Sequence, residues 1–352
     1  MIRRIYQTME LYALTAFIMG LLSLGSLLSR RRFTHQNGIT VEGKLRIVDE
    51  PEFPAHEFFR PGREFPCRVR YATVLYHDDT MLTVRGASIK FADTDLDSPL
   101  DLLLNTGATS LFWSAWTFTQ FLWGGAKGRG KHFVPYFRKY PGALAGTRAS
   151  GRRNPETFAQ LYFYSKVVHG FVDRNGKMYY LKYRLSPEDR GPETGIATPE
   201  DLEEPWIQDT LPGETRSRHY LKDELRERVE REGIRPILQI QLHEPRDDDT
   251  EEIFNSNVEW DEATHPWMDV AHLELTRALD FEEGQRIRFQ MDQHPPSIPI
   301  LPAKSIHDYN SVNFLRYYSN LPRTVRLWSY RLFGVPPRAP EETRSSFKTL
   351  DA

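Results

Sequence analysis

The chain has 352 residues, with 46 Lys and Arg against 48 Asp and Glu, and 39% of its residues are hydrophobic. This composition excludes a disordered tail and a polytopic membrane protein, and a net charge of −2 gives no reason to expect a nucleic-acid partner. The single cysteine, Cys67, excludes an internal disulfide and is typical of a reducing compartment. We expect a globular chain of one large domain or two domains.

The first recognisable element is residues 11–28, which carry no charge. As a helix this segment would reach about 27 Å, close to the hydrocarbon thickness of a bilayer, about 30 Å. We therefore predict that residues 1–33 form a single-pass membrane anchor. An interfacial helix and a cleaved signal peptide are the alternatives. Arginines flank both ends, so the sequence does not decide the orientation, and a cytoplasmic domain is one of the two outcomes.

After residue 37 the pattern changes to short strands rich in β-branched and aromatic residues, separated by turns. Strands are predicted at 39–48, 68–77, 82–91, 100–105, 178–185 and 235–244. Helices are predicted at 131–140, 155–165, 216–233 and 311–333, the last interrupted at Pro322. The fold class is therefore α+β: a barrel of antiparallel strands with surrounding helices over residues 34–334, followed by a polar tail, 335–352. Residues 186–214 are rich in Pro and acidic side chains and are expected to form a long solvated excursion.

Residues 102–155 contain no Asp or Glu and eight Lys or Arg, and they include the aromatic run 111–123. Two interpretations stay open: an apolar and basic surface that rests on anionic lipid, or a buried aromatic helix followed by a solvated loop. Residues 125–131 have the spacing of a phosphate-binding loop, but His132 replaces the required hydroxyl, so no nucleotide site is expected. The histidines show no zinc-ligand spacing.

A set of segments, in order, resembles the catalase superfamily, and within it the short branch similar to allene oxide synthase. These segments are 34–35, 45–48, 59–65, 69–72, 85–91, 105–107, 158–165, 265–277 and 308–311. The resemblance covers roughly residues 34 to 330. It implies an eight-stranded antiparallel barrel that encloses haem b, with the iron ligand on a helix near the C-terminus.

On the side of the haem where peroxide would bind, the resemblance assigns roles to particular residues. Thr34-His35 matches the distal histidine, whose neutral imidazole can accept a peroxide proton and return it. Asn105 matches the distal asparagine, which can hold a peroxide oxygen. Arg70 and Arg32 match arginines that pair with haem propionates. The alternatives are a surface histidine near the membrane, a turn asparagine and ordinary surface arginines.

On the opposite side the pattern departs from the family. The resemblance implies Arg-x-x-x-Tyr, in which the arginine keeps a phenolate ionised against ferric iron. Here Arg316 is in place, but Asn320 stands where the tyrosine is expected. On a continuous helix Tyr318 would point about 160° away from Asn320. Tyr318 remains the candidate iron ligand after a register shift, although Phe314 would then replace its arginine partner.

Three functions are consistent with these residues. The first is a membrane-associated haem protein that cleaves the O–O bond of an organic hydroperoxide, with a fatty-acyl lipid as the expected substrate. The second is a hydrogen peroxide catalase or peroxidase. The third is a haem-free barrel with a binding or accessory role, which is motivated by Asn320.

Overall fold

The computed structural model describes residues 2–74, 78–126, 130–206 and 209–338. Within these ranges eight strands close into an antiparallel barrel in the order β2-β1-β10-β9-β8-β6-β4-β3, and β3 pairs with β2 again. β5 pairs with β3, and β7 pairs with β8. The strands are β1 Gly38–Ile47, β2 Glu64–Thr73, β3 Thr83–Lys90, β4 Asp101–Thr106, β5 Gly151–Arg152, β6 Phe163–Tyr164, β7 His169–Val172, β8 Met178–Ser186, β9 Ile237–His243 and β10 Met268–Ala278.

The barrel interior is filled by alternate side chains of its strands, because successive residues of a strand point to opposite faces. Val69, Ala87, Ile89 and Leu104 belong to the main hydrophobic core. Their strand neighbours lie on the outer face. The outer face of β2, β3 and β4 is mostly buried as well, and α4 packs against β3 and β4.

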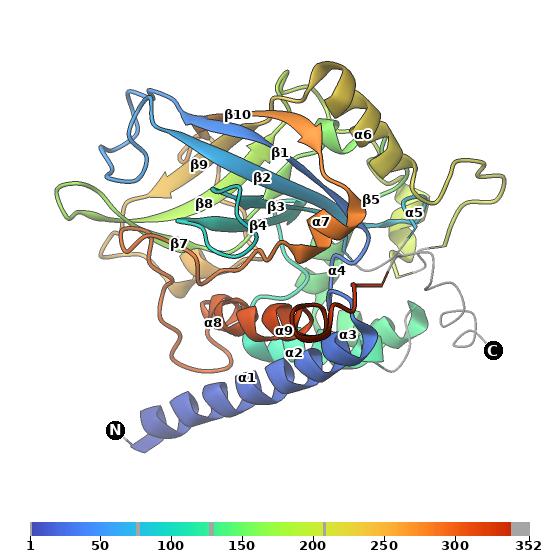
Figure 1. The fold of residues 1–352 in the computed structure, drawn as a ribbon. Helices are drawn as coiled ribbons and strands as arrows, with labels where there is room; N and C mark the ends of the chain where they lie inside the picture. Colours follow the sequence, from blue (N-terminus) through green and yellow to red (C-terminus); the bar gives the residue numbers. More distant parts are fainter. Residues whose placement is uncertain (1, 75–77, 127–129, 207–208, 339–352) are drawn as a thin grey trace.

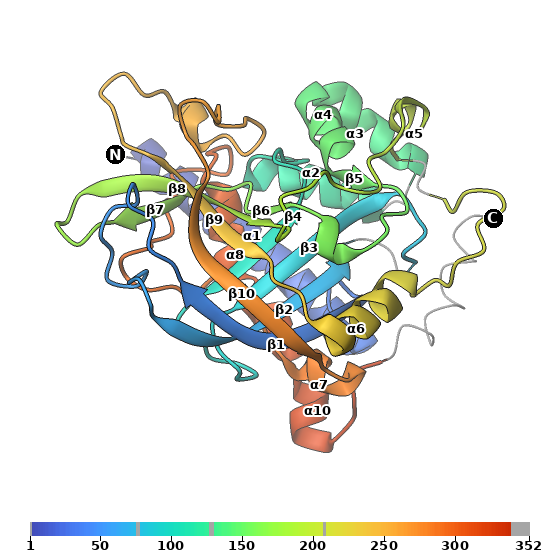
Figure 2. The same ribbon diagram turned by 90° about the horizontal axis from the view of Figure 1, so that it is seen from above.

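Helices cover the barrel on several sides (Figures 1 and 2). They are α1 Ile2–Ser29, α2 Ala115–Ala126, α3 Val134–Lys139, α4 Pro141–Ser150, α5 Pro199–Glu203, α6 Tyr220–Glu232, α7 Phe281–Arg286, α8 Ser311–Tyr318, α9 Asn320–Val325 and α10 Trp328–Phe333. α6 buries Leu221, Leu225 and Val229, which recur every four residues and so lie on one helical face.

α1 runs beneath the barrel and lies against α2, α8 and α9 (Figure 1). Leu11, Ile18 and Met19 are buried in a cluster with residues of α2 and α8. Among the described residues, α1 is the helix long and apolar enough to cross a membrane. Another side of α1 exposes Met9, Phe17 and other large apolar side chains. α1 is therefore both a packed part of the fold and an apolar surface.

The predicted α+β fold and barrel are confirmed, but the helix predicted at 155–165 is wrong. Only Phe158–Gln160 forms a short 3-10 turn, capped by the Thr157 side chain, and Phe163–Tyr164 is strand β6. Phe158 and Phe163 enter the barrel core, and this packing requires extended backbone between them. Strand β10 was not among the predicted strands. The strand predicted at 68–77 is β2, which runs Glu64–Thr73; residues 75–77 lie outside the described ranges.

The helical region 311–333 is interrupted at Ser319 and again at Arg326 and Leu327, and not at Pro322. Pro322 lies in the first turn of α9, where a helix does not need the missing N–H. The helix predicted at 131–140 is split into a 3-10 turn, Gly130–Phe133, and α3.

The aromatic run 111–123 resolves into mostly buried structure. Trp113, Trp116, Phe118 and Phe121 pack in two hydrophobic clusters around α2. The fifth aromatic residue of this part of the run, Trp123, is strongly exposed, at 62%. The buried aromatic helix is therefore the correct alternative for this segment. Residues 127–129 of the basic loop lie outside the described residues.

The predicted excursion 186–214 is partly docked on the barrel. It contains α5, and its Glu193 and Asp201 pair with Arg152 and Arg153 at 2.6 and 2.9 Å. Residues 207–208 and most of the predicted tail, 339–352, lie outside the described ranges.

Candidate functional site

His35 lies just after α1 in a left-handed backbone conformation, with φ of 55°. Its backbone N–H donates to Val74 O at 3.1 Å, which ties this turn to the end of β2. The imidazole lies directly over Gly86 of β3. A Cβ at Gly86 would stand 2.6 Å from two ring atoms of His35, so only glycine leaves room for the ring. Strained backbone of this kind often accompanies a functional side chain.

The strand register brings Asn105 to the same place. Asn105 of β4 pairs with Gly86, and Arg70 of β2 pairs with Ser88 of β3. Directly paired residues project from the same face of a sheet, and so do residues two apart along a strand. His35, Asn105 and Arg70 therefore meet on the outer face of the barrel, away from its hydrophobic core.

Hydrogen bonds connect the distal residues in a chain. Asn105 Oδ1 lies 3.0 Å from His35 Nε2, Thr34 Oγ1 lies 3.2 Å from His35 Nδ1, and Thr34 Oγ1 donates to Val74 O at 3.1 Å. When Thr34 donates to Val74 O, its oxygen can accept the proton of Nδ1. Oδ1 of Asn105 can only accept, however, so its contact with Nε2 as it stands needs the proton on Nε2. The lone pair lies on Nε2 in the other tautomer, in which Thr34 accepts the Nδ1 proton and the Asn105 amide turns its N–H group towards the ring or a ligand. Burial lowers the pKa of His35 to about 3, so the ring is neutral at ordinary pH.

Four arginines surround this group: Arg32, Arg70 and Arg326 are buried, and Arg323 is partly buried. Among the described residues, the hydrogen bonds of their guanidinium groups go to main-chain oxygens. Arg70 donates to His35 O at 2.8 Å and to Gln36 O at 3.3 Å. Arg32 donates to Gly284 O at 3.0 Å and to Ile287 O at 2.8 Å. Arg326 donates to Gln285 O at 2.6 Å and to Ile287 O at 3.2 Å, and Arg323 donates to Phe289 O.

No carboxylate of the described residues forms an ion pair with these four arginines. Burial lowers the pKa of Arg70 and Arg323 to about 10 and of Arg326 to about 9, and it lowers the pKa of Arg32 well below its usual value. Nε of Arg32 and Nε and Nη1 of Arg326 have no hydrogen-bond partner among the described residues. Because buried charges without a counterion cost several kcal/mol, this cluster is suited to an anionic ligand.

The arginines and the distal residues line one cavity of about 430 Å³. Its lining comprises Arg32, Phe33, Thr34, His35, Arg70, Ser88, Leu103, Phe289, Arg323 and Arg326. The structure thus brings together Thr34, His35, Arg32 and Arg70 of the predicted site around this cavity. Asn105 does not line the cavity but contacts His35, which does. Sequence reasoning missed Gly86, Arg323 and Arg326. The spacing Arg-x-x-Arg after Pro322 was the available signal, since such residues share one side of a helix.

The other predicted residues lie on α8 and α9. Arg316 is partly buried and donates to Leu103 O at 2.7 Å, and desolvation lowers its pKa to about 9. The amide of Asn320 donates to Asp292 Oδ2 at 2.6 Å. Tyr318 does not line the cavity: its ring packs against Phe314 and Tyr12, with centroids 5.0 and 6.3 Å away. The structure therefore does not place Tyr318 beside His35 and Asn105.

Haem b has two carboxylates and an iron that takes an axial ligand, and the residues meet these requirements unequally. Four unpaired arginines at the cavity suit two carboxylates, and a neutral histidine and an asparagine suit the distal side. On the other side, the slot of the family's tyrosinate holds Asn320, which is bound to Asp292. The donor set therefore fits the propionates and the distal face, and it departs from the family only in the axial residue.

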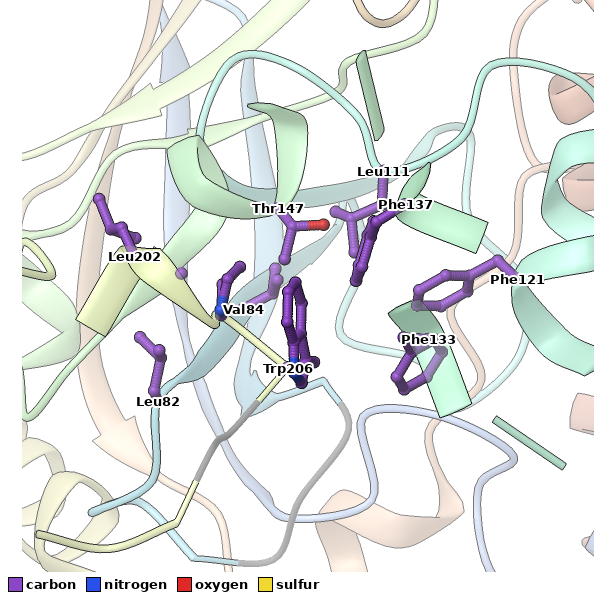
Figure 3. A pocket seen from close by; sticks show the side chains of 11 residues that line it. Leu82, Val84, Leu111, Phe121, Phe133, Phe137, Thr147, Leu202 and Trp206 are labelled. Carbon is purple, nitrogen blue, oxygen red and sulfur yellow. The ribbon is translucent and has the colours of Figure 1, made fainter. Parts of the chain in front are cut away.

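A second cavity, which is open to solvent, lies at Val84, two residues before Gly86 on β3 (Figure 3). Its lining is almost entirely apolar: Leu82, Val84, Leu111, Phe121, Phe133, Phe137, Leu202, Pro205 and Trp206, with Thr147 and Gly151. Val84 precedes Gly86 by two residues, so it lies on the same outer face of the sheet as the distal group.

No family model matches the chain. An allene oxide synthase-lipoxygenase protein of Plexaura homomalla is 38% identical over 84% of this chain and 28% of its own length. Linolenate 9R-lipoxygenase of a Nostoc strain is 27% identical over 88% of this chain and 40% of its own length. The chain thus spans less than half of these curated relatives.

Solved catalases share the fold. Catalase A from Saccharomyces cerevisiae has a TM-score of 0.64 at 18% identity, covering 83% of this chain and 60% of that one. A fungal catalase has a TM-score of 0.62 at 18% identity, covering 83% and 61%.

Proposed function

We propose that the chain, which resembles the allene oxide synthase-like branch of the catalase superfamily and shares the fold of solved catalases, binds haem b and converts a fatty-acyl hydroperoxide by O–O bond cleavage. The observation that supports this most strongly is the set of four arginines, three buried and one partly buried, that lie beside the His35–Asn105 pair and form no ion pair with a described carboxylate. The relatives point to the substrate class: one is an allene oxide synthase-lipoxygenase protein and another is named for linolenate, a fatty acid.

When bound, haem supplies the redox chemistry of O–O cleavage. The chain's residues would do the rest. Nε2 of neutral His35 accepts the hydroperoxide proton and can return it to the leaving oxygen. The amide of Asn105 holds the peroxide oxygen by donating a hydrogen bond. Thr34 accepts from Nδ1 in the tautomer that leaves Nε2 unprotonated, so it is a positioning residue. Arg32, Arg70, Arg323 and Arg326 would bind the propionates.

The apolar cavity of Figure 3 supports a long-chain substrate over hydrogen peroxide. Its wall at Val84 lies two residues from Gly86, where the imidazole of His35 rests. A hydrocarbon chain would bury apolar surface there at about 25 cal/mol per Å². Hydrogen peroxide would gain nothing from this cavity.

A haem-free binding protein is the second candidate, and Asn320 favours it. An amide bound to Asp292 at 2.6 Å is a weak replacement for tyrosinate. The experiment is to load the full chain with haem and follow the consumption of a fatty-acid hydroperoxide and of hydrogen peroxide. Faster consumption of the fatty-acid hydroperoxide is expected. Faster consumption of hydrogen peroxide would indicate a catalase, and consumption of neither would favour the binding protein.

The packing of α1 supports a helix that lies in the plane of a membrane surface rather than one that crosses the membrane. α1 contacts α2, α8 and α9 while it exposes Met9, Phe17, Leu21 and Leu28. A helix that crossed a bilayer would have to leave these neighbours. The exposed row can instead sink into the interfacial region while the packed row stays on the protein.

The anchor is tested with vesicles and the full chain. Phe17→Gln with Leu21→Gln is expected to abolish flotation with the vesicles without changing the thermal midpoint, since both side chains are exposed. Protease added outside should reach both an N-terminal tag and the barrel. Protection of the tag alone would show a spanning helix instead.

A further inference from the structure

A third cavity lies on the outer face of the barrel, on the side of β4 away from β3. Its volume is about 360 Å³. Its lining is polar and aromatic: Ala108, Tyr164, Lys166, Lys182, Tyr183, Gln241, Glu259, Trp260, Glu262 and Trp267. Lys182 of β8 pairs with Gln241 of β9, so both side chains project from one face of the sheet. None of these residues belongs to the site proposed above.

Two buried lysines distinguish this cavity. Lys166 and Lys182 are 6% and 5% exposed, and no carboxylate of the described residues forms an ion pair with either. Lys166 Nζ donates to Ser150 Oγ at 2.7 Å, and Lys182 Nζ donates to Val258 O at 2.8 Å. An ammonium group has three N–H donors, so each lysine keeps donors for a further acceptor. Lys166 is also held in a left-handed backbone conformation, with φ of 60°.

The acidic side chains near the two lysines do not neutralise both of them, so the cavity can accept one anion. Glu262 is already paired with Arg184 at 3.3 Å and accepts from Trp267 Nε1 at 2.9 Å. Glu259 is exposed at the rim and raises the pKa of Lys182 only in part. Burial lowers the pKa of Lys182 and of Lys166 to about 7, and for Lys166 the nearby Arg152 and Arg316 add to the shift. An added carboxylate would compensate both lysines.

The cavity lies within reach of the distal group on the same face of the sheet. Asn105 of β4 pairs with Tyr164 of β6, and Tyr164 pairs with Arg184 of β8. Lys182 precedes Arg184 by two residues, so it projects from the same face. Two strand spacings of about 4.8 Å and two residues along β8 place the Cα atoms of Asn105 and Lys182 about 12 Å apart. The apolar cavity at Val84 lies on the other side of Asn105.

We propose that this lysine cavity binds a carboxylate, and that its occupant is the carboxyl end of the fatty-acyl substrate. The identity of the acid rests on the proposed function, whereas the carboxylate site rests on Lys166 and Lys182 alone. The acyl chain would then run past His35 and Asn105, with its hydroperoxide between the two ends and its tail in the apolar cavity. Such a pose fixes which carbon meets the distal group.

The test measures binding of an unreactive acid, so it needs neither haem nor turnover. Decanoate, 1-decanol and acetate are titrated into the full chain by calorimetry at pH 6. Decanoate is expected to bind at least about tenfold more tightly than 1-decanol, because only the acid forms charge-assisted hydrogen bonds. Lys182→Gln should weaken decanoate binding about tenfold and leave 1-decanol binding unchanged. Lys304→Gln, whose side chain is 80% exposed, is the matched control.

Three results would overturn the proposal. One is unchanged decanoate affinity in folded Lys182→Gln. Another is a loss of affinity in Arg70→Gln instead, which would place the carboxylate on the arginine cluster. The third is acetate binding as tightly as decanoate, which would indicate a site for small anions.

If Lys182→Gln does not fold, the pH dependence of wild-type binding decides. Affinity should fall from pH 6 to pH 9 as the lysines lose their charge, because decanoate stays ionised throughout. Most of this fall is expected between pH 6 and pH 8, because burial lowers the pKa of Arg316, a neighbour of Lys166, only to about 9. The other charged groups that face the lysines are Glu259 and Arg152, and burial lowers the pKa of the nearby His265. A flat profile would contradict the proposal. Failed turnover with intact decanoate binding would reject the proposed function and leave the carboxylate site standing.

Discussion

Nε2 of His35 lies 3.0 Å from Oδ1 of Asn105, although 70 residues separate them in the chain. His35 comes from the turn after α1, and Asn105 comes from strand β4. Gly86, between them on β3, has no side chain to keep them apart. This contact places a neutral base and an amide donor at the mouth of a cavity that is lined by unpaired arginines.

His35→Ala should abolish most hydroperoxide turnover by the haem-loaded protein, by about 10²–10⁴-fold, because it removes the proton acceptor. Haem uptake should change little, since the arginines remain. The measurement is kcat with a fatty-acid hydroperoxide beside a haem titration. His272→Ala, at an exposed histidine, is the control. Turnover at the wild-type rate would show that His35 is not the base.

Gly86→Ala should displace the imidazole without removing it. The new Cβ would stand 2.6 Å from two His35 ring atoms and 3.1 Å from Asn105 Oδ1. Overpacking of this kind costs about 1–3 kcal/mol of stability. We expect a lower thermal midpoint and at least about tenfold lower kcat. Gly20→Ala, which meets no atom within 4 Å, serves as the comparison. Full activity in Gly86→Ala would mean that the ring does not need this position.

The strand pattern of the barrel could be predicted because its cause is local. β-branched, aromatic and aliphatic residues between turns predicted β1, β3, β4, β8 and β9 to within two residues of their ends. The helix predicted at 155–165 was wrong because core contacts of Phe158 and Phe163 outweigh the helical composition of this region. These contacts form only when the barrel closes.

The site was predictable only in part, and for a physical reason. The resemblance located His35, Asn105, Arg32 and Arg70 from short motifs. No carboxylate of the described residues forms an ion pair with Arg326, and Asp101 and Asp292 lie near Arg323 without pairing with it. These are properties of the folded chain, because an arginine in sequence shows neither its burial nor its partners. The role of Gly86 depends on the position of His35, which the sequence also does not show.

Acid should destabilise the protein through its buried neutral histidines. Burial lowers the pKa of both His35 and His169 to about 3. Between pH 6.5 and pH 3 the unfolded chain therefore binds more protons than the folded chain. As the pH falls, the free energy of unfolding should therefore decrease by up to about 1.4 kcal/mol per pH unit for each histidine. Urea unfolding of His169→Phe should show a shallower fall between pH 7 and pH 5. An unchanged slope would show that His169 is protonated normally.

Asn320→Tyr should restore the family's axial residue on the turn after Arg316. A phenol there would have its pKa lowered by the guanidinium and could bind ferric iron. The haem-loaded variant should acquire the visible spectrum of a high-spin ferric tyrosinate. Tyr318→Phe should leave haem uptake unchanged, because Tyr318 packs against Tyr12 and Phe314. Loss of haem in Tyr318→Phe would identify Tyr318 as the ligand.

The central claim is that the arginine cluster holds haem, and titration of haem into the full chain tests it most directly. Wild type should show a Soret band that saturates at one equivalent. Arg326→Gln should weaken this binding about tenfold or more, yet raise the thermal midpoint of the haem-free protein, because it removes one unpaired buried charge. Arg331→Gln, at an exposed arginine of α10, should change neither. A wild-type titration without a saturating Soret band would contradict the claim.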